Sequence, residues 1–273
     1  MAWQPKLVAL DIDGTLVDGA GRIPAELASA VADVQDAGVP VVLCTGRGWH
    51  STHEVADALR LAHGPHVTSN GAVLVTYPPL HVDEVITFDP GDVIERVARE
   101  HPRCLIAVEV VGQGYLVNRH FPDGELGGTI EVVDLDTLAR RPATRVVVRD
   151  PDASDGEFIQ LAERMGLTGV SYAVGYTAWL DIAPEGIDKA HGLAQVCTRL
   201  GVDPADVLAL GDGRNDIEML AFAGRGVALG DAPPEVQDAA DEVTGLFAEG
   251  GTTDELRRWF PSGGASVRGA VTQ

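Results

Sequence analysis

The strongest constraint on the fold is the alternation of short apolar runs with helical periodicity near the start of the chain. Residues 6–10 and 39–44 are nearly continuous apolar runs, as expected of strands that are covered on both faces. Between them, residues 24–37 carry apolar side chains at helical spacing, and a second helix is expected near residues 51–61. This order of strand and helix predicts right-handed crossovers and a parallel sheet.

The same alternation returns late in the chain, where a helix over 193–200, a strand at 207–210, a helix at 217–221 and a strand at 226–229 are predicted. The middle of the chain differs. Its pattern predicts strands at 105–110, 115–118, 145–149 and 179–182, and helices near 92–100 and 156–165. We predict an α/β fold, in which residues 1–81 and 184–260 form a Rossmann-like parallel-sheet core. Residues 82–183 would form an inserted α+β domain, and residues 261–273 a flexible tail.

Charge restricts the partners of this chain. The sequence has 41 acidic and 20 basic residues and a formal net charge of −21. Such a surface repels phosphate backbones and anionic lipids, which makes nucleic acid and membranes poor partners. An anionic substrate would need a local positive site built from a cation, backbone amides and a few basic residues.

Cysteine usage and the start of the chain bear on the compartment. Cys44, Cys104 and Cys197 are widely spaced and form neither a disulfide framework nor a zinc pattern, so buried free thiols are expected. The first residues resemble no signal peptide, and no apolar run is long enough to span a bilayer. These features predict a cytoplasmic protein. The sequence does not indicate an oligomeric state.

Polar clusters follow the predicted strands, and ligands in open α/β sheets bind beyond the carboxyl ends of strands. Asp11 and Asp13 follow the first strand directly. Two carboxylates so close would repel unless a cation lay between them or one held a proton, and Mg²⁺ favours such oxygen ligands. A turn or a helix cap is the alternative reading of this segment.

Two further clusters are weaker signals. Thr45, Gly46 and Arg47 follow the second strand and could form an anion cradle, although a simple turn would also use these residues. Lys189 is one of only two lysines, the other being Lys6. In a sequence that otherwise uses arginine, this favours a compact ammonium over a guanidinium there, and chance is the alternative reading.

The fourth cluster lies at residues 211–216, between a predicted strand and a predicted helix. Asn215 or Asp216 could cap that helix. A cap does not explain Asp212 at the strand end, whereas ligation of a metal ion does.

Taken in order, these clusters resemble the four motifs of the haloacid dehalogenase-like (HAD) phosphatases: residues 11–17, Thr45, Lys189 and residues 211–216. The chain is also similar to the Cof-type subgroup, subclass IIB, in which the inserted domain is a cap. The similarity lies in the inserted domain, in residues 69–72 and in residues 227–232. One departure is Asp231, where that subgroup usually carries Asn. This puts in doubt a neutral polar contact at that position.

The resemblance implies a mechanism. Asp11 would attack phosphorus and form an aspartyl-phosphate, while Asp13 would act as general acid and then as general base. Mg²⁺ would be held by the Asp11 and Asp212 carboxylates and the Asp13 carbonyl, with Asp216 reaching it through water or orienting Asp212. The residues expected to hold the phosphoryl oxygens are Ile12, Thr45, Gly46, Lys189 and Asn215.

The resemblance leaves alternatives open. A phosphomutase would use the same nucleophile, and a receiver-type signalling domain also has an acidic Mg²⁺ pocket, although it is usually much shorter. A dinucleotide-binding fold is disfavoured because residues 11–15 replace its glycine-rich loop. The Asn70-Gly71 pair is interpreted as a type I′ hairpin turn in preference to a substrate contact. The cap would select a small phosphorylated metabolite, with a sugar phosphate preferred.

Overall fold

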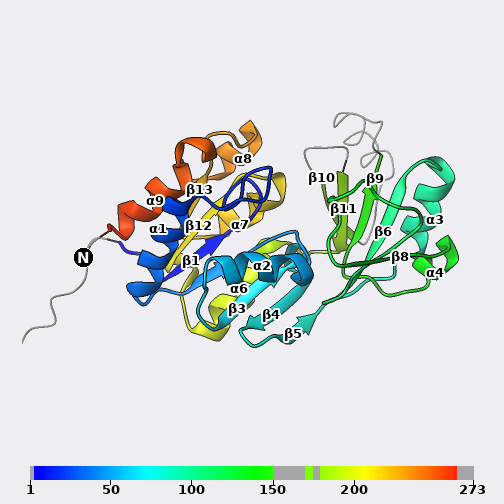
Figure 1. Ribbon diagram of the computed structural model, residues 1–273, viewed down its shortest axis with the longest axis horizontal. Helices are drawn as coiled ribbons and strands as arrows, with labels where there is room; N and C mark the ends of the chain where they lie inside the picture. Colours follow the sequence, from blue (N-terminus) through cyan, green and yellow to red (C-terminus); the bar gives the residue numbers. More distant parts are fainter. Residues whose placement is uncertain (1–2, 151–169, 175–178, 263–273) are drawn as a thin grey trace, which may run out of the picture.

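The computed structural model describes residues 3–150, 170–174 and 179–262 (Figure 1). The helix predicted at 156–165 and nearly all of the predicted tail lie outside these residues. Two sheets lie at opposite ends of the molecule, and a small third sheet lies between and below them in this view.

The sheet of the core is parallel, as predicted. Its strand order is β14-β13-β12-β1-β2, and every neighbouring pair is parallel. The strands are β1 (Leu7–Leu10), β2 (Val41–Leu43), β12 (Val207–Gly211), β13 (Arg225–Ala228) and β14 (Glu242–Val243). The prediction of a parallel-sheet α/β core is confirmed.

Helices cover both faces of this sheet. The bounds are α1 (Ala25–Asp36), α2 (Trp49–Ala58), α6 (Lys189–Leu200), α7 (Ile217–Phe222), α8 (Pro234–Ala239) and α9 (Gly251–Trp259). Side chains alternate along a strand, so Val8 and Leu10 pack with α1, α2 and α9, whereas Leu7 and Ala9 pack with α6, α7 and α8. Burial on both faces explains the continuous apolar runs of the strands.

An antiparallel sheet extends the core beside β2. Its strands are β3 (Gly64–Thr68), β4 (Val73–Tyr77) and β5 (His81–Val85), and a parallel bridge joins Cys44 to Val67. The turn between β3 and β4 contains Asn70 and Gly71, so the predicted hairpin is present. The hairpin prediction gave no bounds for these strands, although β4 consists of the apolar, β-branched and aromatic residues typical of a strand.

The inserted segment forms a six-stranded, largely antiparallel sheet in the order β10-β11-β9-β6-β7-β8. Its strands are β6 (Leu105–Val110), β7 (Gly114–Val117), β8 (Thr129–Val132), β9 (Val146–Arg149), β10 (Val170–Val174) and β11 (Trp179–Pro184). Helices α3 (Gly91–Glu100) and α4 (Leu135–Ala139) cover the face that lies away from the core (Figure 1).

The limits of the inserted domain stay a prediction. Val82 lies inside β5 and Ala183 inside β11, so the predicted boundaries fall within strands and not between them. The three cysteines are free and buried, as predicted. No helix in the described part of the chain is both long and apolar enough to cross a membrane.

Candidate active site

The candidate site lies at the carboxyl edge of the parallel sheet. Asp11 follows β1, Thr45 comes two residues after β2, and Asp212 follows β12. Since β1 is paired with both β2 and β12, the ends of these strands are neighbours. The fold therefore brings together three of the four sequence clusters without any further rearrangement.

Three carboxylates meet at this edge. Oxygens of Asp11, Asp212 and Asp216 lie within 4.8 Å of one another, and all three residues are buried. Oδ2 of Asp216 accepts hydrogen bonds from the backbone N–H groups of Asp212, at 3.1 Å, and Gly213, at 2.8 Å. Asp216 thus fixes the loop that carries Asp212, which agrees with the orienting role considered for it.

Lys189 lies among these carboxylates, at the first position of α6. Its Nζ donates to Oδ1 of Asp11 and to Oδ1 of Asp216, each at 2.6 Å, and its side chain is fully buried. Burial opposes the charge, but Asp11 and Asp216 outweigh it and raise the pKa of the ammonium. Lys189 is therefore a fixed positive charge inside the site.

One ammonium does not balance three buried carboxylates. Burial and the neighbouring Asp216 raise the pKa of Asp11 well above its usual range, and the same two causes raise that of Asp212 to about 7. Hard carboxylate oxygens at this spacing are the ligands that Mg²⁺ favours, and a divalent cation would offset the excess negative charge. The residues present therefore fit a divalent metal ion.

The loop after β1 fits closely against Asp212. Gly14 has a φ of +78°, and a Cβ there would lie 2.2 Å from Oδ2 of Asp212, so only glycine is tolerated. Thr15 donates from Oγ1 to Oδ1 of Asp212 at 3.1 Å. These contacts explain why glycine and threonine follow the two aspartates.

Asp13 has a different environment from Asp11. Its side chain is 62% exposed and forms an ion pair with Arg47, whose Nε donates to Oδ2 of Asp13 at 2.8 Å. The carboxylate that joins Asp11 is that of Asp212, and not that of its near neighbour in the sequence. Arg47 stood in the second sequence cluster, but no partner for it could be predicted.

The residues predicted to bind phosphate line the same edge. In the part of the chain that the structure describes, the backbone N–H groups of Ile12 and Gly46 make no hydrogen bond. Thr45 is buried, and its Oγ1 accepts from the backbone N–H of Arg47 at 3.0 Å. A Cβ on Gly46 would lie 3.3 Å from Nδ2 of Asn215, so the second and fourth clusters meet here.

Asn70 is a site residue that the sequence interpretation assigned to a turn. Its side-chain Oδ1 accepts from Nδ2 of Asn215 at 2.9 Å, and its Nδ2 donates to Oδ2 of Asp181 at 3.4 Å. The signal that could have found it was the similarity of residues 69–72 to the Cof-type subgroup. Asp231, the noted departure, is exposed, and its charge contributes to the raised pKa of Asp212.

The cap sheet turns a polar face toward the core. Glu109 on β6 is paired with Tyr115 on the neighbouring strand β7. Asp181 on β11 is paired with Val147 on β9, and Arg145 lies two residues before Val147. Since side chains two residues apart point to the same side of a strand, the side chains of Glu109, Tyr115, Arg145 and Asp181 share one face. Nε of Arg145 donates to Oδ1 of Asp181 at 2.7 Å, and Nη1 donates to the Tyr115 hydroxyl at 3.0 Å.

Core residues meet this polar face. A Cβ on Gly48 would lie 2.4 Å from Oε1 of Glu109, and the rings of His50 and Tyr115 pack edge to face with centroids 5.2 Å apart. Glu109 also accepts from Oγ1 of Thr144 at 3.0 Å. The sequence offered no signal for these cap residues, because their neighbours come from distant strands.

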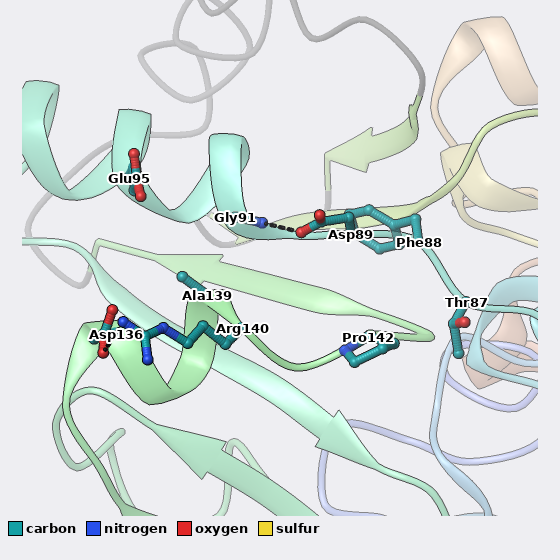
Figure 2. Close-up of a pocket in the computed structure, with 9 residues that line it drawn as sticks. All are labelled: Thr87, Phe88, Asp89, Gly91, Glu95, Asp136, Ala139, Arg140 and Pro142. Carbon is teal, nitrogen blue, oxygen red and sulfur yellow. Dashed lines mark hydrogen bonds and ion pairs between the residues drawn. The ribbon is translucent and has the colours of Figure 1, made fainter.

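A separate hollow of about 690 Å³ lies on the outer side of the cap. It is lined by residues 87–89 before α3, by the start of α3 and by the end of α4 (Figure 2). The backbone N–H of Gly91 donates to Asp89 at 3.0 Å there, and Arg140 pairs with Asp136 at 2.9 Å. None of the candidate site residues lines this hollow.

Comparison with known proteins places this arrangement in a family. Residues 8–256 match the haloacid dehalogenase-like hydrolases, which is most of the chain. The chain therefore belongs to the haloacid dehalogenase-like hydrolases. The predicted enzyme class, a phosphoric monoester hydrolase of this superfamily, is confirmed.

Individual relatives agree with this assignment. The chain is 29% identical over 262 residues to a 5-amino-6-(5-phospho-D-ribitylamino)uracil phosphatase of Bacillus subtilis, with 93% of this chain and 95% of the relative covered. A solved HAD phosphatase from Bacteroides thetaiotaomicron is 28% identical, with a TM-score of 0.78 and coverage of 94% and 95%. A subclass IIB sugar phosphatase shares the fold at 23% identity, with a TM-score of 0.79 and coverage of 93% and 98%.

Proposed function

We propose that this protein is a Mg²⁺-dependent phosphatase that hydrolyses a small phosphorylated metabolite through an aspartyl-phosphate on Asp11. The observation that carries the proposal is the buried group of three carboxylates around Lys189 at the carboxyl edge of the sheet. Membership of a hydrolase family with phosphatase relatives supports it.

The carboxylates of Asp11 and Asp212 and the main-chain carbonyl of Asp13 would hold the ion. When bound, Mg²⁺ supplies positive charge that offsets these carboxylates and the charge of the phosphoryl group. Asp216 contributes by fixing the loop of Asp212 through two backbone hydrogen bonds. The same positive charge resolves the conflict between a net charge of −21 and an anionic substrate.

Asp11 is the proposed nucleophile. A carboxylate oxygen of Asp11 attacks phosphorus, the bond from phosphorus to the leaving oxygen breaks, and an aspartyl-phosphate forms. Lys189 donates to Asp11 at 2.6 Å, which holds the carboxylate in one orientation and favours its ionised form. Water then attacks the phosphorus, which releases phosphate and restores the carboxylate.

Asp13 is the proposed general acid and base. In the first step it gives a proton to the leaving oxygen, and in the second it takes a proton from the attacking water. Its exposed position supports this role, because the carboxylate lies outside the buried group of three and is accessible to a leaving oxygen and to water. Arg47 would hold it in place between turnovers.

The phosphoryl oxygens would be held by Thr45, by Lys189, by Asn215 and by the backbone N–H groups of Ile12 and Gly46. Those two amides make no hydrogen bond to other described residues, so they are available to an anion. Donors fixed before the substrate arrives stabilise the charge of the transition state at little reorganisation cost.

A sugar phosphate is the proposed kind of substrate. The cap face places a carboxylate, Glu109, beside the Arg145–Asp181 ion pair, so it carries no net positive charge. Such a face offers hydrogen-bond acceptors to hydroxyl groups and repels a second anionic group on the substrate. Residues 82–183 would form the cap, residues 1–81 and 184–260 the core, and the cytoplasm is the proposed location.

A phosphate-release assay tests the proposal. Wild-type protein with Mg²⁺ should release phosphate from a generic ester, and Asp11→Asn should lose at least about 10³-fold in kcat because the nucleophile is gone. Retained activity in Asp11→Asn would refute the mechanism. Across a panel, kcat/KM should be higher for neutral sugar phosphates than for phosphoglycolate, whose leaving group carries a carboxylate.

The same assay separates a hydrolase from a phosphomutase. A mutase would need a bisphosphorylated sugar as activator and would return the phosphoryl group to a sugar. Release of inorganic phosphate without such an activator supports the hydrolase.

A further inference from the structure

The Asn70 side chain bridges the core and the cap. On one side it accepts a hydrogen bond from Asn215, 145 residues away in sequence, and on the other it donates to Asp181, 111 residues away. Asp181 in turn holds Arg145 in an ion pair at 2.7 Å. A single amide therefore joins a candidate phosphate-binding residue of the core to the charged pair of the cap.

The turn that carries Asn70 is held firmly. Asn70 has a φ of +52° and a ψ of +37°, and it is only 6% exposed. Its backbone N–H donates to the carbonyl of Thr45 at 3.0 Å. A Cβ on the next residue, Gly71, would lie 1.9 Å from the carbonyl oxygen of Asp188, so the turn packs directly on the start of α6. The position of the amide is fixed by the backbone.

A turn alone does not require this side chain. Gly, Asn and Asp all tolerate the left-handed conformation. Only an amide can accept from Asn215 and donate to Asp181 at the same time, because glycine has no side chain and an ionised aspartate has no donor. The chemistry of residue 70 thus matches its two partners as well as its backbone.

The contact also limits how Asn215 can point. The amide of Asn215 has two N–H groups, and one of them is used by Asn70. With that N–H taken, the orientation of the amide plane is set, and the second N–H has a fixed direction. Gly46 is close to both side chains, since a Cβ there would lie 3.0 Å from Oδ1 of Asn70.

We propose that Asn70 is a positioning residue, which orients the Asn215 amide toward the phosphoryl group and is itself held by Asp181 of the cap. This inference rests on the proposed function. It makes the phosphate-binding geometry depend on the presence of the cap against the core. Asn70 touches no reacting atom in this scheme and acts through Asn215.

The test compares Asn70→Gly with Arg60→Gly. Arg60 is also left-handed, with a φ of +51°, but it is exposed at the end of α2, so it controls for glycine at such a position. We expect Asn70→Gly to lower kcat by about 10- to 100-fold, as for other residues that orient a ligand-binding group, while KM changes little. Arg60→Gly should keep the wild-type kcat.

A double-mutant cycle with Asn215→Ala separates positioning from a structural role. If Asn70 acts through Asn215, its substitution adds almost nothing to the loss in Asn215→Ala. If the losses of kcat in the two single variants multiply in the double variant, or if Asn70→Gly keeps the wild-type kcat, the inference is overturned, while Asp11-dependent hydrolysis is unaffected. If Asn70→Gly does not fold, as judged by thermal unfolding, Asn70→Asp takes its place, since it keeps the shape but cannot donate to Asp181.

For Asn70→Asp we expect a fall in kcat of at least about tenfold, and a wild-type kcat would overturn the inference. The control for the proposed function is Asp11→Asn in the same assay. A wild-type protein without any Asp11-dependent phosphate release would overturn the proposed function and this inference with it.

Discussion

The core and the cap each bury a group of charges, and the two groups are balanced in different ways. At the edge of the core sheet, Asp11, Asp212 and Asp216 surround one ammonium, that of Lys189. On the cap face, Arg145 is paired with Asp181 and with the Tyr115 hydroxyl, and Glu109 is held by Thr144.

The difference indicates what each region needs. The core group has an excess of negative charge that no described basic residue offsets, so it is suited to bind a cation. The cap group sets one guanidinium against two carboxylates, and each carboxylate has a partner within the protein, so the group can persist without an ion. A metal ion should therefore change the stability of the core far more than that of the cap.

The largest effect is expected for Lys189→Met. The variant removes the only ammonium among three buried carboxylates, so kcat should fall by at least about 10²-fold. The metal-free protein should lose about 3–5 kcal/mol of unfolding free energy, because breaking a buried ion pair leaves its partners uncompensated. Lys6→Met is the matched control, since Lys6 pairs with Asp206 at an exposed position, where solvent screens the pair, and its loss should change stability little. Enzyme kinetics and thermal unfolding of both variants measure this contrast.

The cap counterpart is Arg145→Met. We expect kcat/KM for a sugar phosphate to fall by about 10-fold or more, because Asp181 loses its ion pair with Arg145 and the leaving-group surface changes. Acetyl phosphate, whose small leaving group does not extend far from phosphorus, should be affected less. Added Mg²⁺ should not restore stability in this variant. Equal losses for both substrates would contradict the separate roles of the two regions.

Asp212→Asn tests the excess charge of the core. Because the pKa of Asp212 is raised to about 7, the folded protein binds more protons than the unfolded chain between about pH 4 and pH 7. The stability of the metal-free protein should therefore fall as pH rises through that range. Asp212→Asn should remove part of this slope and raise metal-free stability at pH 8 by about 1–3 kcal/mol. Chemical denaturation with and without Mg²⁺ measures it, and the variant should no longer be stabilised by Mg²⁺.

His50 gives the smallest expected effect, at the contact between core and cap. Burial lowers its pKa to about 4, and neither ring nitrogen has a hydrogen-bond partner among the described residues. The unfolded chain thus binds more protons between about pH 4 and pH 6.5, so stability is complete above that range and is lost as pH falls. His50→Phe should reduce this loss by about 1 kcal/mol, whereas the exposed His120→Phe should not. If the free energy of unfolding of His50→Phe falls with pH as steeply as that of the wild type, the role given to His50 is contradicted.

The sequence predicted the core well because each of its signals is local. Strands such as 207–210 are buried on both faces, so their apolar runs stand out, and the acidic clusters follow them within one or two residues. The bounds of the hairpin strands β3 to β5 and of the short helix α8 were not predicted. Strand β4 carries a comparable apolar run at residues 73–75, but β3 and β5 mix apolar with polar residues, and α8 spans only six residues.

The sequence by itself determined that Asp11, Thr45 and Asp212 follow strands of one sheet, because the succession of strands along the chain and their period follow from local patterns of side chains. Only the tertiary structure decided which side chains meet. The carboxylate beside Asp11 is that of Asp212 and not that of Asp13, which forms an ion pair with Arg47. Asn70 lies between Asn215 and Asp181 and is hydrogen-bonded to both. The physical reason is that such contacts join residues that lie at least 34 positions apart in the sequence, and their geometry is set by the packing of whole elements.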